Sequence, residues 1–391
     1  AMTSWTDRDG GQSRTLAEIV TQRRVLVCCG TGGVGKTTTA AALAIEGARR
    51  GRNAVVVTID PAKRLAQALG LDELSNSARE IDRARWDPDA TAESGGRLHA
   101  LMLDTKSTFD QLVTQNASDE EQAQRILNNG FYRNVAGTLS GTQEYMAMEK
   151  LYELHATGDF DLIVVDTPPT RHALDFLDAP RRLTRLLDNR IFRLLMTPAR
   201  TTFRVGSVAA QAFLRTLARV VGTEVIDDVL SFFRAFEGME EGFRTRSNEM
   251  MELLASPSAA FVLVTSPRRD AVAEAEFFAA RLSDSALAVE ALVVNRVHPR
   301  YDVAAPEVLR ARASELRSRS AAIGDGNGAS SDHLAAQYTN LADLEELALR
   351  EERELSGLEG RIGSAAVAHV PELDHDVHDF DALRAVARHL V

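Results

Sequence analysis

Residues 25–39 read VLVCCGTGGVGKTTT, an apolar run that leads into a glycine-rich segment and then into residues typical of a helix start. Gly30 to Thr37 fits the pattern G-x-x-x-x-G-K-[ST], in which backbone N–H groups converge on phosphate oxygens. An accidental glycine turn is the alternative interpretation. The β-branched run before the turn and the alanine-rich helical pattern from Thr38 to Arg50 supply the context that phosphate binding requires. The stretch therefore predicts a nucleotide-binding loop.

Each residue type in this loop has an expected role. Lys36 is the predicted catalytic cation, because a lysine here meets the terminal phosphates and stabilises their charge. Thr37 is a predicted Mg²⁺ ligand through its hydroxyl group. The residues expected to bind ATP or ADP in this loop are Gly30, Thr31, Gly32, Gly33, Val34, Gly35, Lys36, Thr37 and Thr38.

Composition narrows the class of protein. The chain has 391 residues, enough for one large or two moderate domains. Its net charge of −11 disfavours broad nucleic-acid binding, which usually needs a basic excess. Cys28 and Cys29 are adjacent, so they form neither a disulfide framework nor a Cys-x-x-Cys metal site. The polar stretch from Thr3 to Arg14 does not suggest a signal peptide, and no long apolar run suggests a membrane span. We expect a cytoplasmic protein.

Apolar runs alternate with helical patterns along the chain. Asn53 to Ile59 is a continuous apolar run, as expected for a strand covered on both faces in a parallel sheet. This alternation predicts an α/β fold with a doubly wound, mostly parallel sheet and ligands at the carboxyl ends of the strands. Further strands are expected at Leu98 to Leu103, Asp161 to Val165, Ala260 to Thr265, Ala288 to Asn295 and Ala365 to Val370.

The predicted domain organisation has three parts. Residues 1–22 are expected to be a flexible N-terminus with a short helix around Leu16 to Val20. The nucleotide-binding core is expected to comprise residues 23–104, 158–177 and 258–391. Residues 105–157 and 178–257 show helical spacing and are too long for ordinary crossovers, so we expect an inserted helical subdomain there. Ile323 to Asp332 is expected to be irregular and to lead into a charged surface helix from Leu334 to Leu358.

Two acids are expected at the carboxyl edge of the sheet. Asp60 follows the second strand and is a candidate to orient the attacking water and to contact Mg²⁺. Since Pro61 follows, an ordinary helix N-cap is the alternative role. Asp166 follows an apolar strand and is a candidate Mg²⁺ ligand, whereas a simple polar residue at a strand end is the alternative.

These segments together resemble the ATPase family that includes the arsenite-pump subunit ArsA and the cytosolic ATPase that delivers tail-anchored membrane proteins. The resemblance runs from about Arg23 to the C-terminus and rests on four kinds of segment. They are the glycine-rich loop, the Asp60-Pro61-Ala62 and Asp166-Thr167-Pro168-Pro169-Thr170 switches, Val293-Val294-Asn295, and Val370-Pro371-Glu372. It implies a P-loop ATPase fold with ATP or ADP and Mg²⁺ as cofactors.

The resemblance assigns a role to each of these segments. It implies that Asp60 positions the hydrolytic water and that Asp166 supports Mg²⁺ and senses the γ-phosphate. Asn295 is expected to bind the adenine edge, and Val370 and Pro371 are expected to flank the base.

The family also implies partners. Its members are dimers that enclose two nucleotides, and a helical insertion forms a hydrophobic client groove. Residues 141–149 and the apolar helices from Leu183 to Phe243 are groove candidates, with a hydrophobic or membrane-protein client. Core packing is the alternative for these side chains. The arginines within residues 181–204 either cover a solvent-exposed helix face or contact anionic lipid. At most peripheral membrane contact is therefore expected.

The sequence departs from the family at three positions. Thr31 replaces the signature lysine that reaches across the dimer, so a homodimer is expected to hydrolyse ATP poorly. We therefore favour a heterodimer with a homologous ATPase that carries the lysine, over a homodimer. The cysteines that bind zinc or arsenite in some members are missing, which disfavours arsenite transport, and Arg268 stands where some members have an acid.

Two other classes of protein remain open. A positioning ATPase resembling MinD or ParA would act on a membrane or on DNA, but such proteins lack large helical insertions. A non-hydrolysing ATP-binding scaffold, paired with an active homologue, is consistent with Thr31. The acidic, histidine-bearing run from Asp374 to Asp379 suits either metal binding or capping of the last helix, and we favour capping.

Overall fold

The computed structural model describes residues 14–60, 64–89, 95–135, 142–168, 178–182, 184–185, 188, 227–229, 231–232, 235–236, 238–323 and 328–391. Within these ranges the chain forms an eight-stranded sheet in the order β3-β4-β2-β5-β1-β6-β7-β8. All pairings in it are parallel except that of β3 with β4. The predicted α/β fold with a mostly parallel sheet is confirmed.

The strands begin and end close to the predicted apolar runs. They are β1 (Val25–Gly30), β2 (Asn53–Thr58), β3 (Arg79–Ile81), β4 (Arg97–Met102), β5 (Leu162–Asp166), β6 (Ala259–Thr265), β7 (Val289–Val297) and β8 (Ala366–Pro371). β3 was not predicted, because its three residues include two exposed charged side chains and give no apolar pattern.

Helices cover both faces of the sheet, and alternate side chains of each strand pack against opposite layers. Leu26 and Cys28 of β1 point to a layer formed by α1 (Leu16–Gln22), α2 (Lys36–Arg49), α3 (Arg64–Ala68), α4 (Arg83–Trp86) and α18 (Phe380–Leu390). Val25 and Val27 point to the other layer, which includes α8 (Thr142–Thr157), α14 (Glu240–Ala255), α15 (Arg269–Asp284) and the end of α17 (Gly328–Ile362). This arrangement is the doubly wound sheet that the sequence predicted.

The core begins earlier in the chain than the sequence suggested. Thr15 caps α1 through a capping box with Glu18, and Leu16, Ile19 and Val20 are buried in the α2 layer. The short helix predicted around Leu16 to Val20 is therefore confirmed, but it packs on the core and does not belong to a flexible N-terminus. Residues 1–13 lie outside the described residues.

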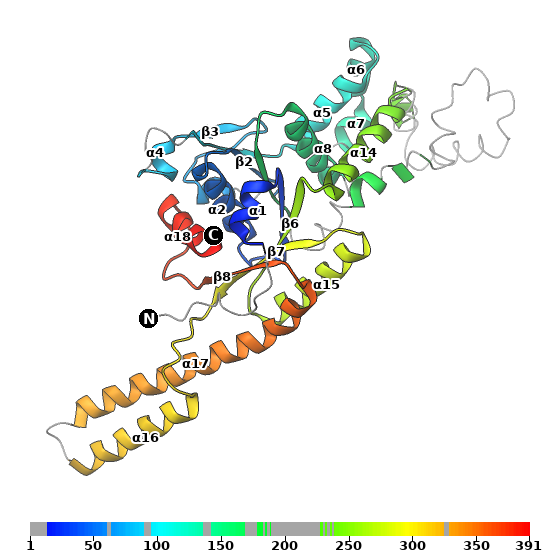
Figure 1. The fold of residues 1–391 in the computed structure, drawn as a ribbon. Helices are drawn as coiled ribbons and strands as arrows, with labels where there is room; N and C mark the ends of the chain where they lie inside the picture. The colour runs from blue at the N-terminus through cyan, green and yellow to red at the C-terminus, as the bar shows by residue number, and fades with distance from the viewer. Residues whose placement is uncertain are drawn as a thin grey trace.

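A group of helices gathers on one side of the sheet, at the upper right of Figure 1. It contains α5 (Thr105–Asn116), α6 (Glu120–Leu127), α7 (Gly130–Val135), α8 and α14. These helices fall in the two stretches expected to form an inserted helical subdomain. Most of residues 169–237 lies outside the described residues, and so do the predicted apolar positions 186, 187, 192, 195, 213, 217, 220 and 233.

A long helical hairpin extends away from the sheet (Figure 1). It consists of α16 (Pro306–Ile323) and α17, whose 35 residues extend beyond both ends of the predicted charged helix. Leu309, Ala313, Ala335 and Ala342 are buried, as expected where small side chains let two helices pack closely. The sequence predicted a surface connection here with an irregular segment from Ile323 to Asp332. The described residues of that segment are helical instead, since α16 ends at Ile323 and α17 begins at Gly328, and residues 324–327 lie outside the described residues. None of the described helices is long and apolar enough to span a bilayer.

Candidate nucleotide-binding site

The glycine-rich loop joins the end of β1 to the start of α2. A Cβ atom on Gly30 would lie 2.0 Å from the carbonyl oxygen of Val264 in the neighbouring strand β6, so a side chain does not fit there. Gly35 is the N-cap of α2 and has a φ of +96°, a conformation that favours glycine. The loop therefore brings the backbone to the N-terminus of α2, where peptide N–H groups and the helix dipole favour a phosphate.

Lys36 is the first residue of α2 and is buried beside the loop. Its Nζ atom donates a hydrogen bond to the carbonyl oxygen of Thr31 at 2.7 Å. Burial lowers the pKa of Lys36, and the negative charge of Asp166 opposes that shift. The side chain therefore lies against the same backbone that the sequence predicted to bind phosphate.

Asp166 ends β5 and receives hydrogen bonds from two hydroxyl groups. Its Oδ2 atom accepts from Thr37 Oγ1 at 2.7 Å and from Thr58 Oγ1 at 3.0 Å. Thr58 ends β2 and is paired in register with Asp166, and the alternation of side chains turns both toward α2. Burial raises the pKa of Asp166 to about 6, although both hydroxyl groups and the charge of Lys36 act in the opposite direction.

The residues around Asp166 fit a magnesium ion. Its Oδ1 atom is buried and accepts no hydrogen bond from the part of the chain that the structure describes. Thr37 donates its proton to Asp166, which leaves the lone pairs of the Thr37 hydroxyl oxygen free to bind a cation. A carboxylate and a hydroxyl oxygen are ligands that Mg²⁺ prefers.

Asp60 lies just beyond the end of β2 and is half-buried. Its backbone N–H donates to Thr58 Oγ1 at 3.3 Å, and the preceding N–H, of Ile59, donates to the carbonyl oxygen of Asp166 at 3.2 Å. The structure thus brings Asp60 and Asp166 to one edge of the sheet, as predicted. Pro61, Ala62 and Lys63, and Pro169 and Thr170 of the second predicted switch, lie outside the described residues.

The predicted base-binding residues lie on β7 and β8 at the same edge. Asn295 Nδ2 donates to the carbonyl oxygen of Val34 at 2.8 Å, so β7 contacts the glycine-rich loop directly. Asn295 is paired with Val370, and Val297 is paired with Pro371. Contact of Asn295, Val370 and Pro371 with adenine stays a prediction.

Sequence reasoning missed two residues of this site. The hydroxyl group of Thr58 contacts the side chain of Asp166 and the backbone N–H of Asp60. In the sequence, its one indication is its position two residues before Asp60. Gln143, in the first turn of α8, donates from Nε2 to the carbonyl oxygen of Ile59 at 2.9 Å. The link from α8 to the strand end could not be read from the sequence, because the two residues lie 84 positions apart.

Several predicted groove residues are buried in the helical group. Tyr145, Met146, Met148 and Phe243 all belong to the hydrophobic core. The rings of Tyr145 and Phe243 stack with centroids 6.3 Å apart. For these side chains the structure shows the core-packing alternative, and they do not line an open groove. Gly141 lies outside the described residues.

Two other sequence features have plain structural roles. Asp379 is the N-cap of α18, and its Oδ1 atom accepts from the N–H of Ala382 at 2.8 Å. The favoured capping role for this acid is therefore what the structure shows. Arg268 is exposed at the start of α15 and pairs with Asp270 at 2.8 Å.

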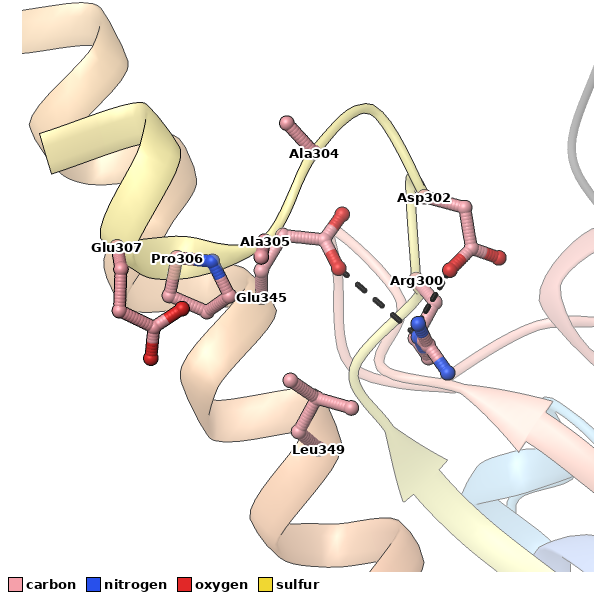
Figure 2. A pocket seen from close by; sticks show the side chains of 8 residues that line it. All are labelled: Arg300, Asp302, Ala304, Ala305, Pro306, Glu307, Glu345 and Leu349. Carbon is pink, nitrogen blue, oxygen red and sulfur yellow. Dashed lines mark ion pairs between the residues drawn. The ribbon is translucent and has the colours of Figure 1, made fainter. Parts of the chain in front are cut away.

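A concavity lies at the base of the helical hairpin. It has a volume of about 350 Å³ and is lined by Arg300, Asp302, Ala304, Ala305, Pro306, Glu307, Glu345 and Leu349. Figure 2 shows Arg300 between Asp302 and Glu345, with which it forms ion pairs. Because acids dominate this lining and its arginine is already paired, it is a poorer site for a phosphate than the glycine-rich loop.

The fold and the site define a P-loop nucleotide-binding protein, with the loop between β1 and α2 and an acid at the end of the adjacent strand β5. Comparison with protein families is more specific. Residues 23–326 match the family described as anion-transporting ATPase, and the chain belongs to that family.

The chain is also similar to curated ATPases over part of its length. It is 30% identical over 189 residues to ATPase GET3 of Malassezia globosa, covering 48% of this chain and 52% of the relative. It is 29% identical over 181 residues to ATPase GET3 of Podospora anserina, covering 46% of this chain and 50% of the relative. The matched part thus spans about half the length of these relatives, whose names indicate ATPases.

Proposed function

We propose that this chain binds Mg·ATP at the carboxyl edge of the sheet, hydrolyses it, and uses the cycle to rearrange its helical group. The observation that carries the proposal is the set of contacts around Asp166. Thr37 from the glycine-rich loop and Thr58 from β2 both donate to one carboxylate oxygen, and the other oxygen is buried without a donor among the described residues.

Each side chain would have a distinct task. Loop N–H groups and Lys36 would bind the phosphates and stabilise charge on the γ-phosphate, while Thr37 and Asp166 would hold the cation. A bound Mg²⁺ would neutralise developing charge on the phosphate oxygens. Asp60 would align the attacking water, and Gln143 would pass a displacement of the strand end to α8.

The decisive test compares the wild type with Asp60→Asn. We expect the variant to lose steady-state ATPase activity while a fluorescent ATP analogue still binds with an affinity close to that of the wild type. The amide is nearly the same size as the carboxylate but cannot accept the proton of the attacking water. Unchanged turnover in the variant would remove Asp60 from the mechanism.

A dimer is part of the proposal, and Thr31 suggests its composition. The resemblance implies a lysine at this position that reaches the partner's nucleotide. We propose that a homologous ATPase carrying this lysine pairs with the present chain, and that a hydrophobic or membrane-protein client binds the helical group. The alternative to this heterodimer is a homodimer of the present chain.

A second candidate function also follows from Thr31. Without a lysine in trans, the chain would bind ATP without turning it over and would serve as a scaffold beside an active homologue. Recovery of intact ATP from the purified protein after prolonged incubation with Mg²⁺ would favour this scaffold function.

A further inference from the structure

The hydroxyl group of Thr58 lies between the two acids of the site. Its proton is donated to Asp166 Oδ2 at 3.0 Å, and its oxygen accepts from the backbone N–H of Asp60 at 3.3 Å. A hydroxyl group has one proton to give and lone pairs that accept, so a single side chain satisfies both contacts. Thr58 is 3% exposed, so water does not readily replace either contact.

Asp166 is oriented by two hydroxyl groups from different elements. Thr37 approaches Oδ2 from the first turn of α2, and Thr58 approaches it from the neighbouring strand. Because both hydroxyl groups bind Oδ2, the Oδ1 atom points away from Thr37 and Thr58. Removing one donor would let the carboxyl group rotate more freely about the Cβ–Cγ bond of Asp166. The position of the proposed cation would then be less well defined.

We propose that Thr58 is a positioning residue that fixes Asp60 relative to Asp166, so that alignment of water and binding of the cation depend on one hydroxyl group. The inference rests on the proposed function, since it takes Asp60 and Asp166 in the roles given there. Thr58 itself touches neither nucleotide nor water in this account. Its effect passes through the two acids.

The test uses substitutions that separate the hydroxyl group from the shape of the side chain. Thr58→Val keeps the shape and removes the hydroxyl, whereas Thr58→Ser keeps the hydroxyl. A fluorescent ADP analogue is titrated onto each full-length protein at increasing Mg²⁺ concentrations, and ATPase rates are measured in parallel. For Thr58→Val we expect the Mg²⁺ concentration for half-maximal binding to rise, and kcat to fall, by about 10-fold or more each. Thr58→Ser should restore both values to within about 3-fold of the wild type.

The control is a buried threonine of α5 whose hydroxyl group bonds to Asn76 and to neither acid. Thr108 is 1% exposed, and its hydroxyl pairs with the Asn76 side chain at 3.1 Å, so Thr108→Val removes a comparable hydrogen bond. We expect this control to leave the Mg²⁺ requirement unchanged. If Thr58→Val does not fold, Thr58→Ala removes the same hydroxyl with less crowding.

The outcomes separate this inference from the proposed function. A wild type that binds nucleotide in a Mg²⁺-dependent manner, together with a valine variant of equal Mg²⁺ requirement, would contradict the role of Thr58 alone. Failure of the serine variant to restore binding would show that packing, and not the hydroxyl group, matters. A wild type without Mg²⁺-dependent nucleotide binding would overturn the proposed function and this inference with it.

Discussion

The hydroxyl oxygen of Thr37 lies 2.7 Å from the Oδ2 atom of Asp166, although 129 positions separate the two residues in the chain. The contact joins the first turn of α2 to the end of β5. It ties the end of the glycine-rich loop to β5, and it leaves one buried carboxylate oxygen for a cation. The protonation of Asp166 should therefore affect both the stability of the protein and its affinity for Mg²⁺.

We expect the nucleotide-free protein to gain stability from Asp166 as the pH falls. Burial raises the pKa of this carboxyl group to about 6, above its value in an unfolded chain. The stabilising contribution is fully present below the unfolded pKa and is lost as the pH rises through about 6. Between pH 7.5 and pH 5, the free energy of unfolding of the wild type should increase by about 1 kcal/mol relative to Asp166→Asn.

Denaturant unfolding of both proteins at several pH values provides the measurement. Titration of other groups largely cancels in the difference between the wild type and the asparagine variant. Saturating Mg·ATP should remove the effect, since a bound cation favours the carboxylate. A difference that stays constant with pH would mean that Asp166 is already ionised in the nucleotide-free protein.

Replacing Thr31 by lysine tests the proposed composition of the dimer. The contact from Lys36 to Thr31 uses a backbone carbonyl oxygen, so Thr31→Lys preserves it. A lysine delivered across a homodimer should raise steady-state turnover by at least about 10-fold, because cations supplied in trans stabilise the transition state. The rates should be measured over a range of protein concentrations.

Thr31→Ala is the matched control, because it changes the side chain without adding a cation. We expect its turnover to stay at the level of the wild type. High activity of the wild-type chain alone, unaffected by Thr31→Lys, would argue against a requirement for a lysine-bearing partner.

Much of the fold could be predicted because its signals are local. Strands β2 and β5 come from continuous apolar runs, and glycines mark the turn that follows β1. The length of α17 and the projection of the hairpin could not be predicted in the same way. Charged side chains on α17 suggested a solvated helix, but its contacts with α16 depend on small residues far apart in sequence.

The site was predicted only in part, for a related reason. Lys36, Thr37 and Asp166 belong to a motif or follow an apolar strand, so each has a signal nearby in the sequence. Thr58 becomes informative only when the register of β2 and β5 is known, because that register places its hydroxyl beside Asp166. Long-range contacts of this kind have no periodic signature.

The glycines of the loop should differ in their tolerance of alanine. A Cβ atom on Gly35 would lie 2.2 Å from Asn295 Nδ2, and its φ of +96° already disfavours a side chain. Gly33 has a φ of +80°, but a Cβ atom there would meet no atom of the described residues within 4 Å. We expect Gly33→Ala to cost about 1 kcal/mol of stability from backbone strain, and Gly35→Ala to cost more.

A double-mutant cycle with Asn295→Ala separates strain from collision. Truncating Asn295 removes the colliding atom, so Gly35→Ala should cost less in that background than in the wild type. The cost of Gly33→Ala should be the same in both backgrounds. Equal costs for Gly35→Ala in the two backgrounds would show that Asn295 moves away without penalty.

The base of the hairpin supplies the last prediction, because two adjacent acids of α17 differ in burial. Glu345 is 2% exposed and accepts the N–H of Tyr301 at 2.8 Å, whereas the Glu346 side chain is 58% exposed and pairs with Arg310. Glu345→Ala should cost about 1–3 kcal/mol, since it leaves the Tyr301 N–H and Arg300 without this partner. Glu346→Ala should change stability by less than about 1 kcal/mol. Amide hydrogen exchange at residues 298–305 should be faster in Glu345→Ala and unchanged in Glu346→Ala. Equal exchange rates in the two variants would mean that Glu345 does not hold this loop on α17.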